Sequence, residues 1–173
     1  MRHIQRVMSI KSVLAASLLL GSILALGYYL WLKPQPAPDI ELASIDGTRI
    51  RLSTLKAHPV LVSFWASDCR SCREELPDLL SLYQEFAPQG FRLLTVAMAY
   101  DPPSRVVALA REQQWPYTVI LDPSGTAAQA FGQVSLIPHH FLIDAQGNIR
   151  MDTVGKLNRD ALHTYINALI EEN

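Results

Sequence analysis

Short apolar runs alternate along this chain with segments in which apolar residues recur every three or four positions. The runs at 59–65, 91–98 and 117–121 are rich in β-branched and aromatic residues and predict buried strands. Helical spacing follows the first run, at Leu76, Leu79, Leu80, Tyr83 and Phe86. Because strands alternate with helices, the pattern predicts an α/β domain in which helices flank a mixed central sheet.

Turn residues predict two β-hairpins. Asp46-Gly47 supplies the turn of an N-terminal hairpin over 41–52, and Gln146-Gly147-Asn148 joins 139–144 to 149–154. Further helices are expected at three places: from 101–104, through 127–131, and after Asn158, which can cap the last helix.

The first 38 residues differ in composition from the rest. Residues 12–32 carry no charge, and about 21 residues of helix span the roughly 30 Å core of a bilayer. Three Lys or Arg residues precede this segment and only Lys33 follows at once, which predicts a cytoplasmic N-terminus. We therefore expect four parts: a cytoplasmic segment 1–11, a transmembrane signal-anchor 12–32, a proline-rich linker 33–38 and a folded α/β domain 39–173.

A cleaved signal peptide is the alternative for the same segment. The apolar run is longer than a usual signal-peptide core, and no small-x-small cleavage site precedes Lys33, so a retained anchor is favoured. Either interpretation puts the domain outside the cytoplasm, on the periplasmic side of the inner membrane, where disulfides persist.

The number and spacing of the cysteines indicate thiol–disulfide chemistry. The chain has two cysteines, Cys69 and Cys72, placed between the first predicted strand and its helix. The first sulfur is expected at the exposed helix N-terminus, where N–H groups and the helix dipole stabilise a thiolate, and the second lies one turn deeper. A structural disulfide would close too short a loop to stabilise much. No second Cys/His pair has zinc-ligand spacing, and a net charge of −1 without a basic cluster in the domain argues against nucleic-acid binding.

The pattern F-W-A-x-x-C-x-x-C-x-x-E-x-P resembles the membrane-anchored thiol-disulfide oxidoreductases of the TlpA/ResA/DsbE type, a branch of the thioredoxin superfamily. The resemblance runs from about residue 38 to the C-terminus and includes Ile137-Pro138 before Phe141-Leu142-Ile143-Asp144. It implies a thioredoxin-like fold with an N-terminal β-hairpin extension, a redox-active Cys69–Cys72 disulfide, no cofactor and no metal. It also implies that the Pro138 peptide bond is cis and faces the cysteines.

The resemblance assigns roles to residues around the cysteines. Cys69 is the expected attacking thiol and Cys72 the resolving one. Glu75 lies on the helix face of Cys72 and matches the acidic residue with which the family steers thiol protonation, although an ordinary surface glutamate remains the alternative. The thioredoxins proper carry a buried aspartate where this chain has Ser63. Glu74 is expected to pair with Arg70 at the surface.

Substrate contacts are expected from Trp65, Ile137 and Pro138. Trp65 supports the cysteines from below, and the backbone at Ile137 can receive an extended partner. Three residues that flank the motif are expected to modulate its redox properties: Asp68, Arg70 and His139. Strand alternation lets only one of His139 and His140 face the cysteines. We favour His139, because it is the first residue of the strand that follows Pro138, and a surface histidine is the alternative.

Two function classes follow. The first is an extracytoplasmic oxidoreductase that reduces protein disulfides, with substrates such as a cytochrome c or a copper-site protein. A membrane thiol reductant would return its cysteine pair to the reduced form. The second is a copper metallochaperone that binds Cu(I) through Cys69, Cys72 and His139. Such chaperones usually have three residues between the cysteines. A peroxidase is disfavoured, because the chain lacks the Thr-x-x-Cys context of a peroxiredoxin.

Overall fold

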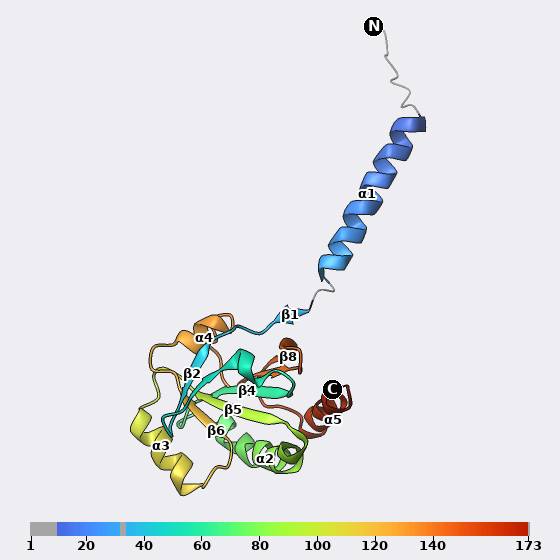
Figure 1. Ribbon diagram of the computed structural model, residues 1–173. Coiled ribbons are helices and arrows are strands. Elements are labelled where there is room, and N and C mark those ends of the chain that lie inside the picture. Colours follow the sequence, from blue (N-terminus) through green and yellow to red (C-terminus); the bar gives the residue numbers. More distant parts are fainter. Residues whose placement is uncertain (1–9, 32–33, 173) are drawn as a thin grey trace. The chain divides into compact units, whose positions relative to one another are not determined.

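The computed structural model describes residues 10–31 and 34–172, which fall into two compact units that divide between Pro34 and Gln35. The first unit contains α1 (Ile10–Trp31) (Figure 1). In the described part of the chain, no helix has the length and apolar character needed to cross a membrane. Residues 1–9, which make up most of the predicted cytoplasmic segment, and residues 32–33 lie outside the described residues.

The second unit is built on one eight-stranded sheet with the order β1-β8-β7-β4-β5-β6-β2-β3. Strands β4, β5 and β6 are parallel, and the other neighbouring pairs are antiparallel, so the predicted mixed sheet is confirmed. The strands are β1 (Gln35–Pro36), β2 (Glu41–Ser44), β3 (Arg49–Arg51), β4 (Val60–Trp65), β5 (Arg92–Ala97), β6 (Thr118–Leu121), β7 (His139–Ile143) and β8 (Asn148–Val154).

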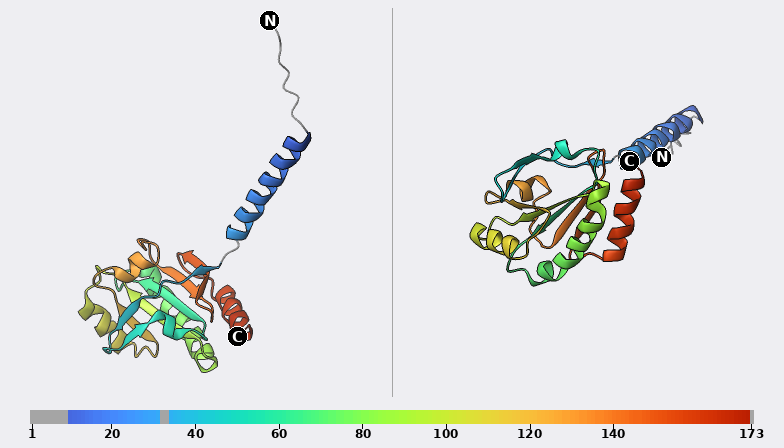
Figure 2. Two further views of the ribbon diagram at one scale, coloured as in Figure 1. Left: turned by 45° about the horizontal axis from the view of Figure 1, so that its top comes forward. Right: turned by 60° about the horizontal axis from the view of Figure 1, so that its bottom comes forward.

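Strand β4 lies at the centre of this sheet, and all six of its residues are buried. A strand covered on both faces reads as a continuous apolar run, which explains why the sequence shows no alternation here. One face packs against α2, α3 and α5, and the other against α4 and η1. Helices α2 and α5 lie side by side (Figure 2). The helical segments are η1 (Leu52–Leu55), α2 (Arg70–Phe86), η2 (Ala87–Gln89), α3 (Pro103–Glu112), α4 (Thr126–Ala130) and α5 (Arg159–Glu171).

The local signals in the sequence are largely confirmed. Both predicted hairpins form, β2 with β3 and β7 with β8. The Asn158 side chain accepts a hydrogen bond from the Ala161 N–H at 3.0 Å and caps α5. Pro77 lies inside α2, as expected from its position in the apolar pattern.

The predicted linker 33–38 requires a correction. Gln35 and Pro36 pair with β8, and the Ala37 N–H donates to the Gly147 carbonyl oxygen at 2.9 Å. The compact domain therefore begins at Gln35 rather than at residue 39. A proline-rich stretch has extended backbone, and an edge strand tolerates a residue that lacks an N–H, so the composition of a spacer also suits an edge strand.

Candidate active site

The cysteine pair lies where β4 passes into α2. Strand β4 ends at Trp65, and Cys69 is the N-cap residue of α2, as the sequence predicted. Cys69 and Cys72 form a disulfide, with their Cα atoms 5.3 Å apart. Cys69 is half-buried, whereas Cys72 is 3% exposed. An incoming thiol or disulfide can therefore reach the Cys69 sulfur but not the Cys72 sulfur.

The start of α2 favours a thiolate on Cys69. The Cys72 N–H donates to the Cys69 Sγ atom over 3.2 Å, and the Ser71 hydroxyl lies 3.4 Å from the same sulfur. Unpaired N–H groups and the helix dipole stabilise negative charge at this position. The geometry thus suits Cys69 as the nucleophile.

A buried carboxylate that the sequence reasoning missed anchors the loop before Cys69. Asp101 is 5% exposed and accepts two hydrogen bonds from Ser67, one from the N–H and one from the hydroxyl, both at 2.6 Å. The sequence suggested only that Asp101 starts a helix, yet α3 has Pro102 as its N-cap residue. The pairing joins residues 34 positions apart, so no local signal could have found it.

Glu75, which lies one turn after Cys72 on α2, forms a buried pair with His140. Glu75 is 2% exposed and the His140 side chain is fully buried, so Glu75 is not the surface glutamate of the alternative interpretation. The His140 Nε2 and Glu75 Oε1 atoms lie 3.2 Å apart, but their alignment falls short of a hydrogen bond. The other oxygen, Oε2, accepts a long hydrogen bond of 3.4 Å from the Leu157 N–H.

The choice of His139 over His140 was wrong. His140 pairs in register with Ser63 of β4, on the sheet face that packs against α2. His139 lies on the opposite face, where it stacks on Phe141 and its Nε2 atom lies 2.6 Å from Asp152 Oδ1. The expected alternation holds, but its parity depends on the register between β7 and β4, which the sequence does not reveal.

The same finding separates the ligands of the predicted copper site. Cys72 and His139 lie on opposite faces of the sheet. Within residues 10–31 and 34–172, no three His, Cys, Asp or Glu side chains gather in a way that could hold a metal ion.

The Ile137-Pro138 peptide bond is cis, as the resemblance implied. His139 pairs with Phe64, which places Pro138 beside the end of β4, where the cysteine loop begins. Ile137 is half-buried and remains a candidate substrate contact, whereas Trp65 is 1% exposed and stacks edge-on against Trp115. Trp65 therefore supports the site from below and cannot meet a substrate at the surface, because the neighbouring core covers it.

Two large side chains near Ile137 and Asp101 in the sequence are exposed. Leu136, next to Ile137, is 65% exposed, and Tyr100, next to Asp101, is 61% exposed. Partial burial, followed by the negative charges of Asp68 and Asp101, raises the pKa of Tyr100. Because the Asp68 charge acts on Tyr100, the tyrosine lies near the loop that precedes Cys69.

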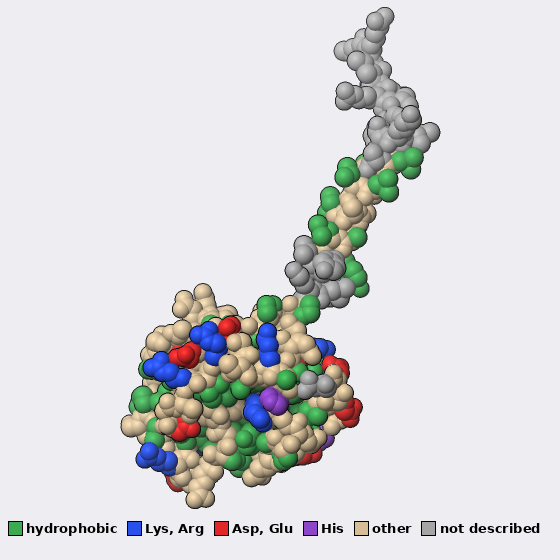
Figure 3. Space-filling model, viewed as in Figure 1, with side chains coloured by type: hydrophobic (Ala, Val, Ile, Leu, Met, Phe, Trp, Pro, Cys, Tyr) green, Lys and Arg blue, Asp and Glu red, His purple; other side chains and the backbone are tan. Residues whose placement is uncertain are grey.

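The charged residues that flank Cys69 are both exposed. Asp68 is exposed. Arg70 is also exposed, and its Nε atom donates to Glu74 Oε1 at 2.9 Å, which confirms the predicted surface pair. Such exposed pairs contribute little to stability. Figure 3 shows basic and acidic side chains interspersed over one face of the domain.

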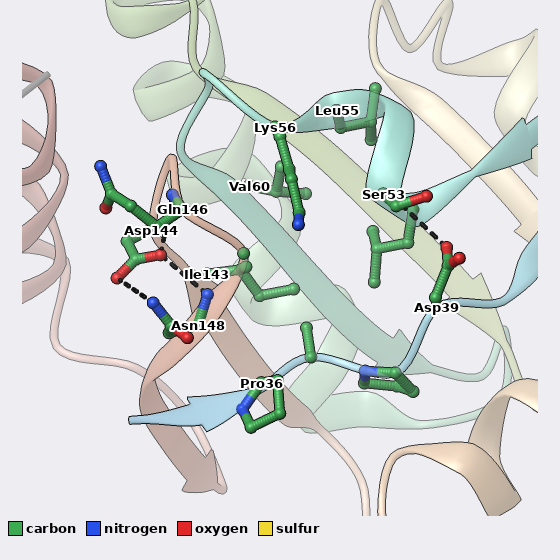
Figure 4. Close-up of a pocket in the computed structure, with 14 residues that line it drawn as sticks. Pro36, Asp39, Ser53, Leu55, Lys56, Val60, Ile143, Asp144, Gln146 and Asn148 are labelled. Atoms are coloured by element: carbon green, nitrogen blue, oxygen red, sulfur yellow. Dashed lines mark hydrogen bonds between the residues drawn. The ribbon is translucent and has the colours of Figure 1, made fainter. Parts of the chain in front are cut away.

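One pocket of the domain lies away from the cysteines. It has a volume of about 320 Å³ and lies near the beginning of β4, between β1, η1 and the turn from β7 to β8. Figure 4 shows the Lys56 side chain extending into it, with Asp39 and Ser53 on one side and Asp144 and Asn148 on the other. No cysteine lines this pocket, so the redox chemistry belongs to the other end of β4.

The fold and the site together define a thioredoxin-like protein that exchanges thiols and disulfides. Residues 34–151 match the model of the AhpC/TSA family. The chain belongs to this family.

Curated relatives are thiol-disulfide oxidoreductases. The chain is 29% identical over 133 residues to the thiol-disulfide oxidoreductase ResA of Bacillus subtilis (strain 168), which covers 77% of this chain and 73% of the relative. It is 24% identical over 167 residues to ResA of Geobacillus kaustophilus, which covers 91% and 95%.

A solved structure agrees with these relatives. The thiol:disulfide interchange protein of the thioredoxin family from Chlorobium tepidum TLS superposes with a TM-score of 0.73 at 26% identity, over 80% of this chain and 97% of that chain. The protein is accordingly a thiol-disulfide oxidoreductase of the ResA/DsbE type, and its Cys69–Cys72 pair fits dithiol/disulfide exchange.

Proposed function

We propose that the protein reduces disulfides of other proteins on the extracytoplasmic side of the cytoplasmic membrane. The observation that carries the proposal is the unequal exposure of the two sulfurs: Cys69 is half-buried at the start of α2, and Cys72 is buried one turn later. The Cys69 sulfur is accessible to a substrate, whereas the buried Cys72 sulfur can react only with Cys69 and so resolves the mixed disulfide.

The exchange proceeds in two steps. The Cys69 thiolate attacks one sulfur of the substrate disulfide, forms a mixed disulfide and releases the other substrate sulfur as a thiolate. Cys72 then loses its proton and attacks the Cys69 sulfur, which forms the Cys69–Cys72 disulfide and releases the second substrate thiolate. Two electrons pass to the substrate, and a membrane thiol reductant returns two electrons to the cysteine pair.

The substrate class is an oxidised thiol pair in a protein, such as an apocytochrome c or a copper-site protein. Support comes from the exposed side chains of Tyr100 and Leu136, which offer apolar surface next in sequence to Asp101 and Ile137. Cis-Pro138 and the backbone at Ile137 stand beside the end of β4, where an extended segment of the substrate can lie along the chain.

The location is proposed from the sequence pattern of residues 1–33. An uncharged segment of 21 residues, 12–32, follows basic residues, which supports an anchor with a cytoplasmic N-terminus. We expect the intact mass of the membrane-extracted protein to include residue 1. A mass that starts near residue 34, or release by salt washing, would contradict a retained anchor.

The direction of the reaction is tested by equilibrium with glutathione. We expect the Cys69–Cys72 pair to have a potential close to the roughly −270 mV of thioredoxin, because a reductant needs a stable disulfide form. A potential near the roughly −120 mV of a strong oxidant such as DsbA would overturn the reductase proposal. Cys69→Ser, which cannot form the disulfide, is the matched control.

A further inference from the structure

Three buried polar atoms without hydrogen-bond partners cluster beneath the disulfide. They are the Glu75 Oε1 atom and both ring nitrogens of His140. Buried polar groups in folded proteins are nearly always paired, so a cluster of unpaired ones calls for an explanation, and a redox role is one. Glu75 and His140 are among the most buried polar residues of the described chain, at 2% and 0% exposure.

The surroundings of His140 bring few ionisable groups to it. Helix α2 contributes Glu75 and, one turn earlier on the same face, Cys72. The neighbouring strands place neutral residues in register with it, Ser63 on β4 and Thr153 on β8. The segment before α5 adds only a backbone group, the Leu157 N–H, which donates to Glu75. Among the described residues, the Glu75 carboxylate is the charged group within ion-pair distance of His140.

The redox state of the cysteines decides whether Cys72 can act as a hydrogen-bond donor. In the disulfide form, Cys72 has no proton to donate. In the dithiol form, Cys72 carries an S–H group on the same face of α2 as Glu75, and this group can donate to the unpaired oxygen. Reduction of the disulfide would thus supply a donor on the same helix face as the oxygen that has none in the disulfide form.

We propose that His140 is a positioning residue for thiol–disulfide exchange, which holds the buried Glu75 carboxylate so that it takes the proton of Cys72. The inference rests on the proposed function. It assigns to His140, through its contact with Glu75, a role that the sequence pattern did not give it.

The proton and electrons balance within the resolving step. The Glu75 carboxylate accepts the proton from the Cys72 Sγ atom as that sulfur attacks Cys69. The new Cys69–Cys72 bond forms, the bond between Cys69 and the substrate sulfur breaks, and the leaving thiolate carries the electron pair away. His140, 3.2 Å from Glu75 Oε1, keeps the carboxylate facing Cys72, while the Leu157 N–H fixes the other oxygen.

The experiment separates the attacking step from the resolving step. The fully reduced protein is mixed with 5,5′-dithiobis(2-nitrobenzoate), and release of the coloured thiolate is followed by stopped flow. The first thiolate leaves when Cys69 attacks, at a rate that depends on reagent concentration. The second leaves when Cys72 resolves the mixed disulfide, at a rate that does not.

Four variants are compared with the wild type: His140→Gln, Glu75→Gln, the double variant, and His139→Gln as the matched control. His139 is the adjacent histidine, but it lies on the other face of the sheet. We expect His140→Gln and Glu75→Gln to slow the second phase about tenfold or more, since general-base catalysis typically contributes about 10²–10⁴-fold. The first phase should be unchanged, and the double variant should be no slower than Glu75→Gln alone.

The pH profile distinguishes this role from a structural one. The wild-type second phase should depend weakly on pH near neutrality, because the base is internal. In His140→Gln and Glu75→Gln, the rate of the second phase should rise with hydroxide concentration, because the proton of the Cys72 thiol must then pass to solvent.

A second phase with wild-type rate and pH profile in His140→Gln, or equal slowing in His139→Gln, would overturn the inference. If His140→Gln does not fold, Glu75→Gln decides, and an unchanged second phase there also overturns it. Absence of the first phase in the wild type would instead refute the proposed function.

Discussion

Two buried carboxylates, Asp144 after β7 and Glu75 on α2, differ in how many hydrogen bonds they accept. Asp144, after β7, accepts hydrogen bonds from the N–H groups of Gln146 and Asn148 at 3.0 and 2.7 Å. The side chains of Asn148 and Arg150 also donate to it, each at 3.3 Å. Glu75, beneath the disulfide, accepts one hydrogen bond of 3.4 Å and has an unpaired oxygen.

The difference shows how the fold uses a buried charge. Burial raises the pKa of Asp144, but the hydrogen bonds from Asn148, Arg150 and Gln146 outweigh it, so the pKa lies below the ordinary value of 3.8. The hydrogen bonds that Asp144 accepts all come from residues of the turn between β7 and β8 or of β8 itself, and they stabilise that turn. Glu75 has capacity left over, and it lies on the face of α2 that carries Cys72. A saturated carboxylate stabilises structure, whereas an unsaturated one is available for chemistry.

Of the substitutions considered, Asp144→Asn is expected to have the largest effect on the free energy of unfolding. The amide replaces one acceptor oxygen by a donor, which opposes the donors of Asn148 and Arg150. Hydrogen bonds to a charged group contribute about 1.5–3 kcal/mol, so the free energy of unfolding should fall by about 2–3 kcal/mol. Urea denaturation at neutral pH measures this loss, and the rates of disulfide exchange should not change.

Asp144 also predicts a direction for the pH dependence of stability. Because its pKa is lower in the folded than in the unfolded protein, its stabilising contribution is complete above the unfolded value of about 3.8. The contribution is lost as the pH falls through the lower folded value. Asp144→Asn should therefore lose less stability on acidification than the wild type, and parallel acid curves would contradict this account.

Glu75→Gln should have the smaller effect on stability. Glutamine keeps the shape of the side chain and can still accept the Leu157 N–H, and the variant no longer buries a charge with an unpaired oxygen. We expect a change of about 1 kcal/mol or less in the free energy of unfolding. The same urea titration serves for both isosteric variants, and a loss in Glu75→Gln as large as that in Asp144→Asn would abolish the contrast.

The smallest effect concerns an exposed carboxylate, Asp68, directly before Cys69. Its negative charge opposes a thiolate on Cys69, whereas the helix N-terminus favours one. Asp68→Asn should lower the pKa of the Cys69 thiol and make the protein a slightly stronger oxidant. Thiolate absorbance against pH measures the change. An unchanged or raised pKa would show that the carboxylate points away from the sulfur.

Local signals in the sequence were sufficient for most of the fold. The buried run at 59–65, the turns at Asp46-Gly47 and Gln146-Gly147-Asn148, and the cap at Asn158 each correspond to an observed element. Such elements depend on neighbouring residues, which the sequence displays directly. The start of the domain was misplaced because proline-rich sequence suits both a spacer and the edge strand β1.

The site was predictable only where it depends on adjacent residues. The order of exposure of Cys69 and Cys72 follows from their positions at the start of one helix. The burial of Glu75, the bond between Ser67 and Asp101, and the choice of His140 over His139 depend on contacts between distant segments. A shift of one residue in the register between β7 and β4 would exchange the two histidines, and the sequence alone does not set that register.

The most direct test of the central claim, that Cys69 attacks and Cys72 resolves, is a trapping experiment with insulin as the disulfide substrate. Reduced Cys72→Ser and Cys69→Ser proteins are incubated with it and compared on non-reducing gels. We predict a mixed disulfide through Cys69 that accumulates in Cys72→Ser, because its resolving thiol is gone, and no adduct in Cys69→Ser, because its remaining sulfur is buried. Equal trapping by the two variants, or trapping by Cys69→Ser alone, would contradict the assignment.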